Sequence, residues 1–357
     1  MKLFVCQACD NPLCFENRFC EGCGHQLAFL PEAQVISALE PEGGGFRALA
    51  EANGERSLCA NAGFGACNWL VDVGTTDAYC RACRHNGTVP NLSDAAQLDR
   101  WRELEIAKHR LFYSLLRWKL PVKTRIEDPD HGLIFNFLAD DLAAGEKVMT
   151  GHDNGLITIA LSEADDSERE RRRLEMGEPY RTLLGHFRHE VGHYFWDVLV
   201  RDGGKLDACR QVFGDDSTDY AGALQRHYTA GACPDWQQDF VSAYATSHPW
   251  EDFAETWAHY LHIVDTLEMA GEFGIEVRPP VDRTGGLTSR VNFDPYRTDD
   301  FGAIVNAWLP FTFAMNNVSR AMGTRDLYPF ILSPTVIDKL GFIHGLVQEV
   351  AKRQDVG

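Results

Sequence analysis

The sequence has no long run of apolar residues. Its apolar stretches, such as Val198–Val200 and Phe330–Leu332, are far shorter than the ~20 residues that a membrane-spanning helix needs. The first residues, MKLFVCQACD, also lack the apolar stretch of a secretory signal peptide. We therefore expect a cytoplasmic protein that does not act at a membrane.

Basic residues are scarce relative to acidic ones. The 357 residues include 34 Lys and Arg against 52 Asp and Glu, which gives a formal net charge of −18. A surface of this sign repels a phosphate backbone, so nucleic acid is not expected as a partner. The apolar content of 45% and the charged content of 24% are those of a folded globular protein, long enough for two or three cores.

Cysteine is unevenly distributed, with nine of the 11 cysteines in the first 83 residues. Cys6-x2-Cys9 and Cys20-x2-Cys23 have the spacing of a zinc ribbon, in which each CxxC turn offers two sulfurs to one tetrahedral ion. The alternative, a pair of disulfides, is not favoured in a chain without a secretion signal. Cys14 lies between the two pairs and is interpreted as a spare thiol.

A second set of four cysteines follows: Cys59, Cys67, Cys80 and Cys83. The last two form a CxxC pair, whereas Cys59-x7-Cys67 is wider than a normal zinc knuckle and requires its loop to fold back. We predict a second structural zinc here, and the alternative is a group of buried thiols beside Trp69. Modules this small have little apolar core, so bound metal would supply much of their stability.

Two joints divide the chain, the glycine-rich Gly43–Gly45 and Asn91-Leu92. We expect a zinc ribbon in residues 1–42, a second four-cysteine zinc-binding module in residues 43–91, and a mainly helical domain in residues 92–357. Strands are expected at Gly132–Leu138 and Gly155–Leu161, and a solvated helix or loop at Ser162–Met176. Apolar periodicity predicts helices from Ser93-Asp94 to Pro121, from Pro179 to about Arg201, and at Ala221–Tyr228, Pro249–Leu267, Phe301–Met322 (kinked or split at Pro310) and Val336–Arg353.

The second of these helices carries an HExxH motif, His189-Glu190-Val191-Gly192-His193. Two histidines four residues apart project from one helix face, so both imidazoles can reach one zinc ion with Glu190 beside it. Gly192 leaves room for a close backbone approach. The alternative is two core or surface histidines without a metal.

A catalytic zinc needs three protein ligands and one open position. We predict Glu251 as the third ligand, because Glu251, Glu255, His259 and His262 form one polar stripe along the helix at Pro249–Leu267. Such a stripe among aromatic residues is costly to bury without a partner. Glu255 is expected to hydrogen-bond a ligand histidine. A solvated helix face is the alternative, and Asp219 is the second candidate for the third ligand.

The HExxH motif and the downstream acidic helix resemble those of the gluzincin metallopeptidases. Tyr244, seven residues before Glu251, looks like the tyrosine in the catalytic segment of anthrax lethal factor, where the corresponding Tyr and Glu are functional. The whole chain is similar to bacterial zinc-binding metallopeptidases with an N-terminal zinc ribbon, judged by the strings GEPYRTLLGHFRHEVGHYFW and VSAYATSHPWEDFAETWAHYLH. The resemblance implies an α+β fold, with a zincin-like, mainly helical metallopeptidase domain behind zinc-ribbon modules. Glu255 stands where an Asp is usual in the better-known gluzincins.

The expected activity is zinc-dependent hydrolysis of peptide bonds in a peptide or protein substrate. Zinc held by His189, His193 and Glu251 would activate water, Glu190 would act as general base, and Tyr244 would hydrogen-bond the oxyanion. The strand Gly155–Leu161 is expected at a sheet edge, where an extended substrate could pair with it. The expected cofactors are one catalytic and two structural zinc ions. Two alternatives stay open: a zinc-ribbon adaptor that binds proteins on an inactive zincin scaffold, and a zinc amidase or isopeptidase.

Overall fold

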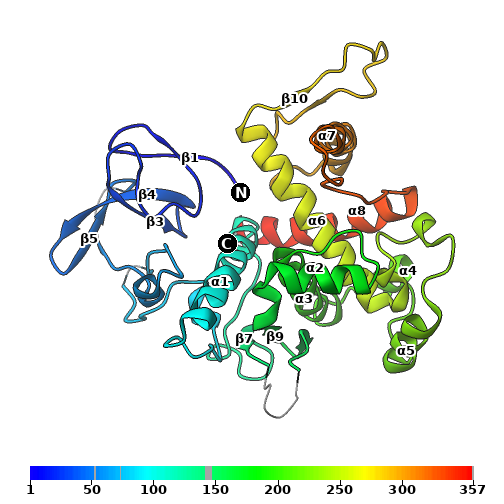
Figure 1. Ribbon diagram of the computed structural model, residues 1–357, viewed down its shortest axis with the longest axis horizontal. Coiled ribbons are helices and arrows are strands. Elements are labelled where there is room, and N and C mark those ends of the chain that lie inside the picture. Colours follow the sequence, from blue (N-terminus) through cyan, green and yellow to red (C-terminus); the bar gives the residue numbers. More distant parts are fainter. Residues whose placement is uncertain (52–53, 73, 141–146, 356–357) are drawn as a thin grey trace. The chain divides into compact units, whose positions relative to one another are not determined.

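The chain folds into two units, one made of residues 1–117 and 121–172, the other of residues 118–120 and 173–357 (Figure 1). The structure is a computed structural model that describes residues 1–51, 54–72, 74–140 and 147–355. Helices and short strands are mixed in it, as expected for an α+β protein. Within the described part of the chain, no helix is both long and apolar enough to cross a bilayer.

The first unit begins with a two-stranded hairpin and a four-stranded antiparallel sheet in the order β3-β4-β5-β6. Buried Ala28, Leu30, Leu39, Ala48 and Leu70 form a small core against this sheet. The strands are β1 (Phe4–Val5) and β2 (Pro12–Leu13) in the hairpin, and β3 (Gln26–Leu30), β4 (Val35–Glu42), β5 (Gly45–Ala48) and β6 (Glu55–Arg56) in the sheet.

The two expected joints, at residues 43–45 and 91–92, both lie inside the first compact unit. Glu42 pairs with Gly45 across the β4–β5 turn, and Gly43 adopts a φ of 59° there, so the glycine-rich joint is a hairpin turn within one sheet. The expected boundary at residue 91 falls inside the first unit, because the next helix packs on the ribbon. Tyr113 of that helix contacts Phe15, with ring centroids 5.4 Å apart. The structure itself divides near residue 172.

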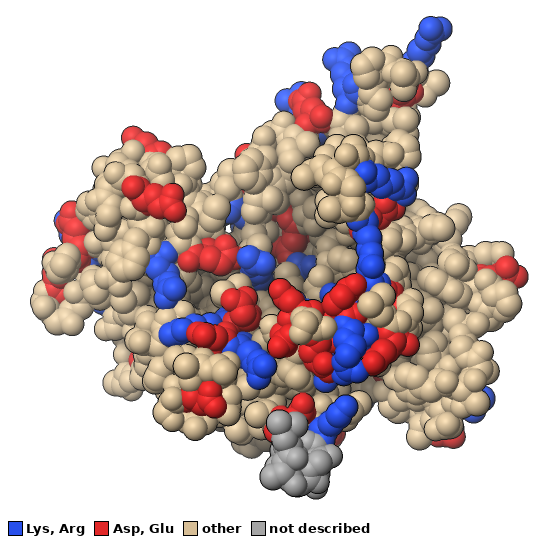
Figure 2. Space-filling view, viewed as in Figure 1, with Lys and Arg blue, Asp and Glu red and all other residues tan. Residues whose placement is uncertain are grey.

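The rest of the first unit is helix α1 (Ala95–Arg117), a three-stranded sheet and a charged helix. The predicted start of α1 is confirmed, since Asp94 accepts a hydrogen bond from the backbone of Ala96. The other elements are β7 (Ile134–Leu138), β8 (Gly151–Asp153), β9 (Leu156–Ala160), the 3₁₀ turns η1 (Ala60–Phe64), η2 (Cys83–His85) and η3 (Leu161–Ala164), and α2 (Asp166–Glu175). On the face shown in Figure 2, Lys and Arg side chains lie next to Asp and Glu, and α2 contains such ion pairs, for example Arg171 with Glu168.

The expectation that residues 155–161 form an edge strand is wrong. The sheet order is β7-β9-β8, with β9 parallel to β7 and antiparallel to β8. Because β9 is hydrogen-bonded on both sides, its backbone is not available to pair with an extended substrate. Its residues are alternately half-buried and buried over Leu156–Ile159, because successive side chains point to the two faces of the sheet.

Helices dominate the second unit, where α6 packs against α3, α7 and α8 (Figure 1). Its elements are α3 (Leu183–Phe195), a π-helical turn η4 (Trp196–Arg201), α4 (Leu206–Phe213), α5 (Tyr220–Ala230), the 3₁₀ turns η5 (Trp236–Gln238) and η6 (Tyr244–Ser247), α6 (Pro249–Glu272), the hairpin strands β10 (Glu276–Val277) and β11 (Ser289–Arg290), α7 (Phe301–Ala321) and α8 (Pro334–Asp355). Two details differ from the sequence-based expectation. Helix α3 begins not at Pro179 but after Thr182, whose side chain accepts from the Gly185 backbone, and α4 was not anticipated.

Helices α3 and α6 approach each other closely at Gly192. A Cβ atom placed on this glycine would lie 3.0 Å from the Ala254 Cα and 3.3 Å from the Trp257 Cβ. One turn further along, the rings of Phe195 and Trp257 stack with centroids 4.9 Å apart. The glycine therefore sets the separation of the two helices.

Replacing Gly192 with Ala is expected to lower the free energy of unfolding by about 1–3 kcal/mol, because the new methyl group pushes against α6 backbone. The measurement is urea unfolding of the full chain. Gly345→Ala in α8 is the matched control, since nothing lies within 4 Å of its added Cβ, and it should stabilise by up to about 1 kcal/mol. Equal stabilities for the two variants would contradict the close approach.

Candidate metal centres

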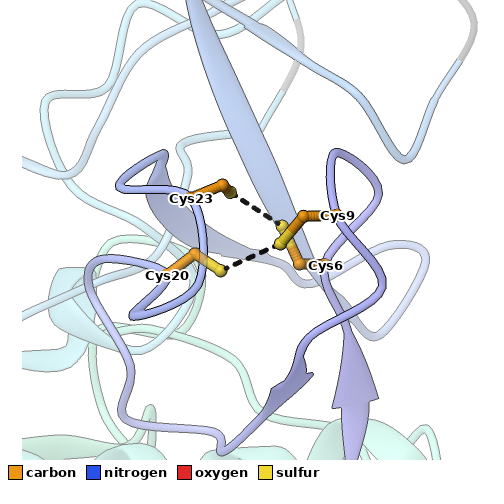
Figure 3. Close-up of side chains that lie close together, drawn as sticks. All are labelled: Cys6, Cys9, Cys20 and Cys23. Atoms are coloured by element: carbon orange, nitrogen blue, oxygen red, sulfur yellow. Dashed lines mark hydrogen bonds between the residues drawn. The ribbon is translucent and has the colours of Figure 1, made fainter.

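The first cysteine set lies on two turns that face each other, and Figure 3 shows its four side chains directed into one space. The sulfurs of Cys6 and Cys23 are 3.7 Å apart, and those of Cys9 and Cys20 are 3.5 Å apart. No disulfide joins them. A tetrahedral zinc with Zn–S bonds of about 2.3 Å places its sulfurs about 3.8 Å apart, so this donor set fits the ion. Cys14 is exposed and lies outside the group.

The second set is also brought together, and all four of its cysteines are buried. The wide Cys59–Cys67 loop folds back through the turn η1, which Gly65 ends with a φ of 68°. Cys67 and Cys80 have their sulfurs 3.7 Å apart, again close to the edge of a zinc–sulfur tetrahedron. Two residues of α1 that sequence reasoning missed, Glu105 and His109, lie against this set.

The third group joins α3 and α6. The Nε2 atoms of His189 and His193 are 3.2 Å apart, and the Glu251 Oε2 atom lies 3.0 and 3.4 Å from them. A tetrahedral zinc with bonds of about 2.0–2.1 Å separates its ligand atoms by about 3.3 Å, so these distances fit. Glu251 is only 1% exposed, and its Oε2 atom faces the Nε2 atoms of both histidines. A metal ion between these three atoms would satisfy the buried oxygen.

Neighbouring side chains orient this group. The His189 Nδ1 atom lies 2.7 Å from the Glu255 Oε1 atom, so this nitrogen carries the proton and the Nε2 lone pair faces the proposed ion. Ser242 donates a hydrogen bond of 2.6 Å to the other oxygen of Glu255. The Tyr220 hydroxyl donates a hydrogen bond of 2.6 Å to Glu251 Oε1. Tyr220 and Ser242 were not found from the sequence, because neither has a fixed spacing from the HExxH motif.

The charges in this group shift one another's pKa values. Burial opposes protonation of His189, but hydrogen bonds and charge from Glu251 and Glu255 outweigh it and raise the His189 pKa well above its usual range. Burial would raise the pKa of Glu255, yet the hydrogen bond and charge of His189 lower it to about 2. Burial would also raise the pKa of Glu251, but His193 and His189 hold it well below its usual range. Both carboxylates are therefore ionised at neutral pH.

The other two predicted residues lie beside the group. Glu190 is 8% exposed, and its carboxylate forms no hydrogen bond or ion pair with the residues that the structure describes. The Tyr244 ring lies 5.9 Å from that of His189, measured between centroids. Burial, followed by the charge of Glu251, raises the Tyr244 pKa, so its hydroxyl keeps its proton and remains a donor.

Asp219, the second candidate for the third ligand, lies outside the group. It is the residue before α5, and its side chain accepts a hydrogen bond from the Gly222 backbone, as a helix cap does. The four polar residues of the stripe on α6 do not all face the metal group. Glu251 and Glu255 face His189, whereas His259 lies 2.8 Å from the Tyr328 hydroxyl and His262 lies 3.4 Å from Arg188.

Comparison with known proteins matches two successive segments of the chain to known families. Residues 97–346 match the model of a family described as "Putative zinc-binding metallo-peptidase", and residues 3–94 match a zinc-ribbon domain. The chain thus combines a zinc-ribbon domain with a segment of the metallopeptidase type. It belongs to that metallopeptidase family. No solved structure matches it.

The chain is also similar to proteins from Mycobacterium bovis and from two strains of Mycobacterium tuberculosis, each named "Uncharacterized protein". Each is 42% identical over 352 residues, which cover 98% of this chain and 96% of the relative. The likeness therefore spans the ribbon and the helical part together.

Removing the Tyr220 hydroxyl is expected to weaken metal binding at the HExxH group. Tyr220→Phe frees one oxygen of Glu251 from its hydrogen bond, and such supporting contacts are worth about 10–100-fold in metal affinity. Zinc affinity of the full chain can be measured by competition with a chelator. Tyr228→Phe on the same helix is the control, because Tyr228 is 64% exposed. Unchanged affinity in Tyr220→Phe would refute the supporting role.

Acidification is expected to destabilise the second unit through His262. Burial, then the charges of Arg188 and His259, lower its pKa to about 3 against the opposing charge of Asp265. An unfolded histidine has a pKa of about 6.5, so between these values the unfolded chain binds the extra proton. Stability is thus fully present above pH ~6.5 and falls as pH decreases, by up to about 1.4 kcal/mol per pH unit.

The test compares urea unfolding of the wild type and His262→Phe between about pH 7 and about pH 4. This range begins just above the pKa of a free imidazole, about 6.5, where the loss of stability should start. The variant should lose stability less steeply on acidification. His131→Phe, at an exposed position, should keep the wild-type slope. Parallel curves for His262→Phe and the wild type would contradict the buried neutral histidine.

Proposed function

We propose that the protein is a zinc-dependent peptidase whose catalytic metal is held by His189, His193 and Glu251. The observation that carries the proposal is the convergence of two imidazole nitrogens and one carboxylate oxygen within 3.0–3.4 Å. Two helices supply three ligands, which leaves one tetrahedral position for water, as in catalytic rather than structural zinc sites. Membership of the metallopeptidase family supports the same reaction.

Zinc bound there would lower the pKa of its water and polarise the scissile carbonyl. Glu190 follows His189 on α3, and its carboxylate is free to accept the water proton as general base and to pass it to the leaving nitrogen. Glu255 keeps the His189 imidazole in the tautomer that points Nε2 at the metal position. The peptide bond is thereby cleaved with addition of one water across its carbon and nitrogen.

Tyr244 is the proposed donor to the oxyanion. Its ring lies beside His189 and is flanked by His227, with centroids 5.8 Å apart, which fixes the phenol at the edge of the metal group. A protonated phenol can stabilise the negative charge that develops on the carbonyl oxygen. This arrangement supports a gluzincin-like, zincin-type catalytic domain, in which Glu255 takes the place of the usual Asp.

The two cysteine sets are proposed to hold structural zinc, which brings the total to one catalytic and two structural ions. Their donor spacings support this assignment. An amidase or isopeptidase would use the same ion and base, so the proposal covers amide hydrolysis in a peptide or protein substrate. The intact base Glu190 favours an enzyme over a protein-binding adaptor, since an adaptor needs only the metal ligands.

Replacing Glu190 with Gln is expected to lower turnover about 10²–10⁴-fold while the zinc content stays unchanged, because the amide cannot accept the proton. The full chain, loaded with zinc, is incubated with a broad peptide library, and cleavage is followed by mass spectrometry. Glu276→Gln, on the exposed β10 strand, is the matched control and should retain wild-type turnover.

Two results would count against the proposal. Full turnover in Glu190→Gln would mean that another group is the base. A wild type that contains all its zinc and cleaves neither peptides nor side-chain amides would favour the adaptor. Tyr244→Phe provides a separate check, with a reduced kcat and a nearly unchanged KM expected if the hydroxyl acts on the oxyanion.

A further inference from the structure

His109 of α1 lies against the second cysteine set. Its Nε2 atom is 3.3 Å from the Cys67 sulfur and 3.6 Å from the Cys83 sulfur. The side chain is buried, with 4% exposed, and its ring packs against Trp69 with centroids 5.1 Å apart. His109 lies outside residues 3–94, the segment that matches the zinc-ribbon domain.

The other ring nitrogen of His109 fixes its tautomer. Nδ1 lies 2.6 Å from the backbone oxygen of Glu105, an atom that can only accept, so Nδ1 carries the proton and donates it. Nε2 then presents a lone pair to the two sulfurs. Donation of one ring N–H to a backbone carbonyl is the usual arrangement of a histidine whose second nitrogen binds a metal.

The distances suit a shared ion. For Zn–S bonds of about 2.3 Å and a Zn–N bond of about 2.0–2.1 Å, tetrahedral geometry separates sulfur from nitrogen by about 3.5 Å. The observed 3.3 and 3.6 Å bracket this value. The sulfurs of Cys67 and Cys80, 3.7 Å apart, have the spacing of two thiolates on the same ion.

We propose that His109 is a ligand of the second zinc site, so that this site is a mixed centre of three cysteines and one histidine. Charge favours this set. Four thiolates around Zn²⁺ leave a net charge of −2 in a fully buried site, whereas three thiolates and a neutral imidazole leave −1, which costs less to bury. The nearest buried cation, Lys108, does not supply the missing compensation, because it is already paired with the carboxylate of Glu105 at 2.8 Å.

The first cysteine set differs from the second in its histidine contacts and in its exposure to water. His25, at a partly exposed position, contacts the sulfur of Cys23 at 3.2 Å. Cys9 and Cys23 are exposed to water, so a net charge of −2 is tolerated there. We therefore assign four sulfurs to the first site and three sulfurs with one nitrogen to the second. Zinc would then join the segment 59–83 to α1, beyond the end of the zinc-ribbon match.

The test is cadmium-113 NMR of the full chain after zinc has been replaced by cadmium-113, because the chemical shift of this nucleus depends on the number of sulfur ligands. The wild type should give one resonance typical of four sulfurs and one typical of three sulfurs and one nitrogen. His109→Ala should shift or abolish the second resonance alone and lower the affinity of one zinc by about 10-fold or more in chelator competition. His109→Cys should restore the affinity and move the resonance to the four-sulfur range.

His85→Ala is the matched control. His85 is equally buried and also bonds a backbone oxygen through Nδ1, that of Leu133 at 2.7 Å, but it contacts no cysteine sulfur among the described residues. This variant should leave every cadmium resonance in place. Two four-sulfur resonances in the wild type, or unchanged spectra and affinity in His109→Ala, would overturn the assignment.

The outcome is independent of the catalytic proposal. The cadmium at His189, His193 and Glu251 has no sulfur ligand, so its resonance lies in a separate range. Its absence would count against the peptidase without affecting the second cysteine site. If His109→Ala fails to fold, the wild-type spectrum together with His109→Cys decides the question, because only a ligand histidine converts the site to four sulfurs.

Discussion

Lone pairs that converge on one point are stabilised by a cation between them, and this interaction underlies the three candidate metal centres. In these centres, sulfur, nitrogen or oxygen atoms lie 3.0–3.7 Å apart. At such distances their lone pairs repel one another, whereas one tetrahedral ion between them would bind them all. Each centre also joins segments that are distant in the sequence, such as His193 and Glu251. Metal binding in the ribbon would also contribute folding free energy.

Local spacing carried most of what the sequence could predict. The two CxxC pairs of the first set and the histidines of HExxH are close in sequence, so the turn or helix that holds them decides their geometry. The long helices were also predicted, because an apolar stripe that repeats at helical spacing over about 20 residues indicates which face of the helix is buried. The domain boundary at Gly43–Gly45 could not be read, because glycines in a tight hairpin turn and in a linker look alike in a sequence.

Contacts made by residues outside the recognisable motifs could not be predicted. Tyr220 and His109 are a helical tyrosine and a helical histidine with no motif around them, and only the fold places them beside Glu251 and Cys67. The stripe on α6 makes the same point. Its periodicity predicted one face, but what that face meets changes along the helix, from His189 near the start to Tyr328 and Arg188 further on.

The hydrogen bond from Tyr220 to Glu251 affects which metal ion the HExxH centre can select. With one oxygen of the carboxylate occupied by the phenol, Glu251 offers a single oxygen, and the centre has two nitrogens and one oxygen in total. Calcium seeks six to eight oxygens, and magnesium an octahedron of them, so neither is satisfied by this set. Imidazole donors with a single carboxylate oxygen suit a small borderline ion of low coordination number instead. A tyrosine remote from the motif thus helps to exclude the abundant cellular cations.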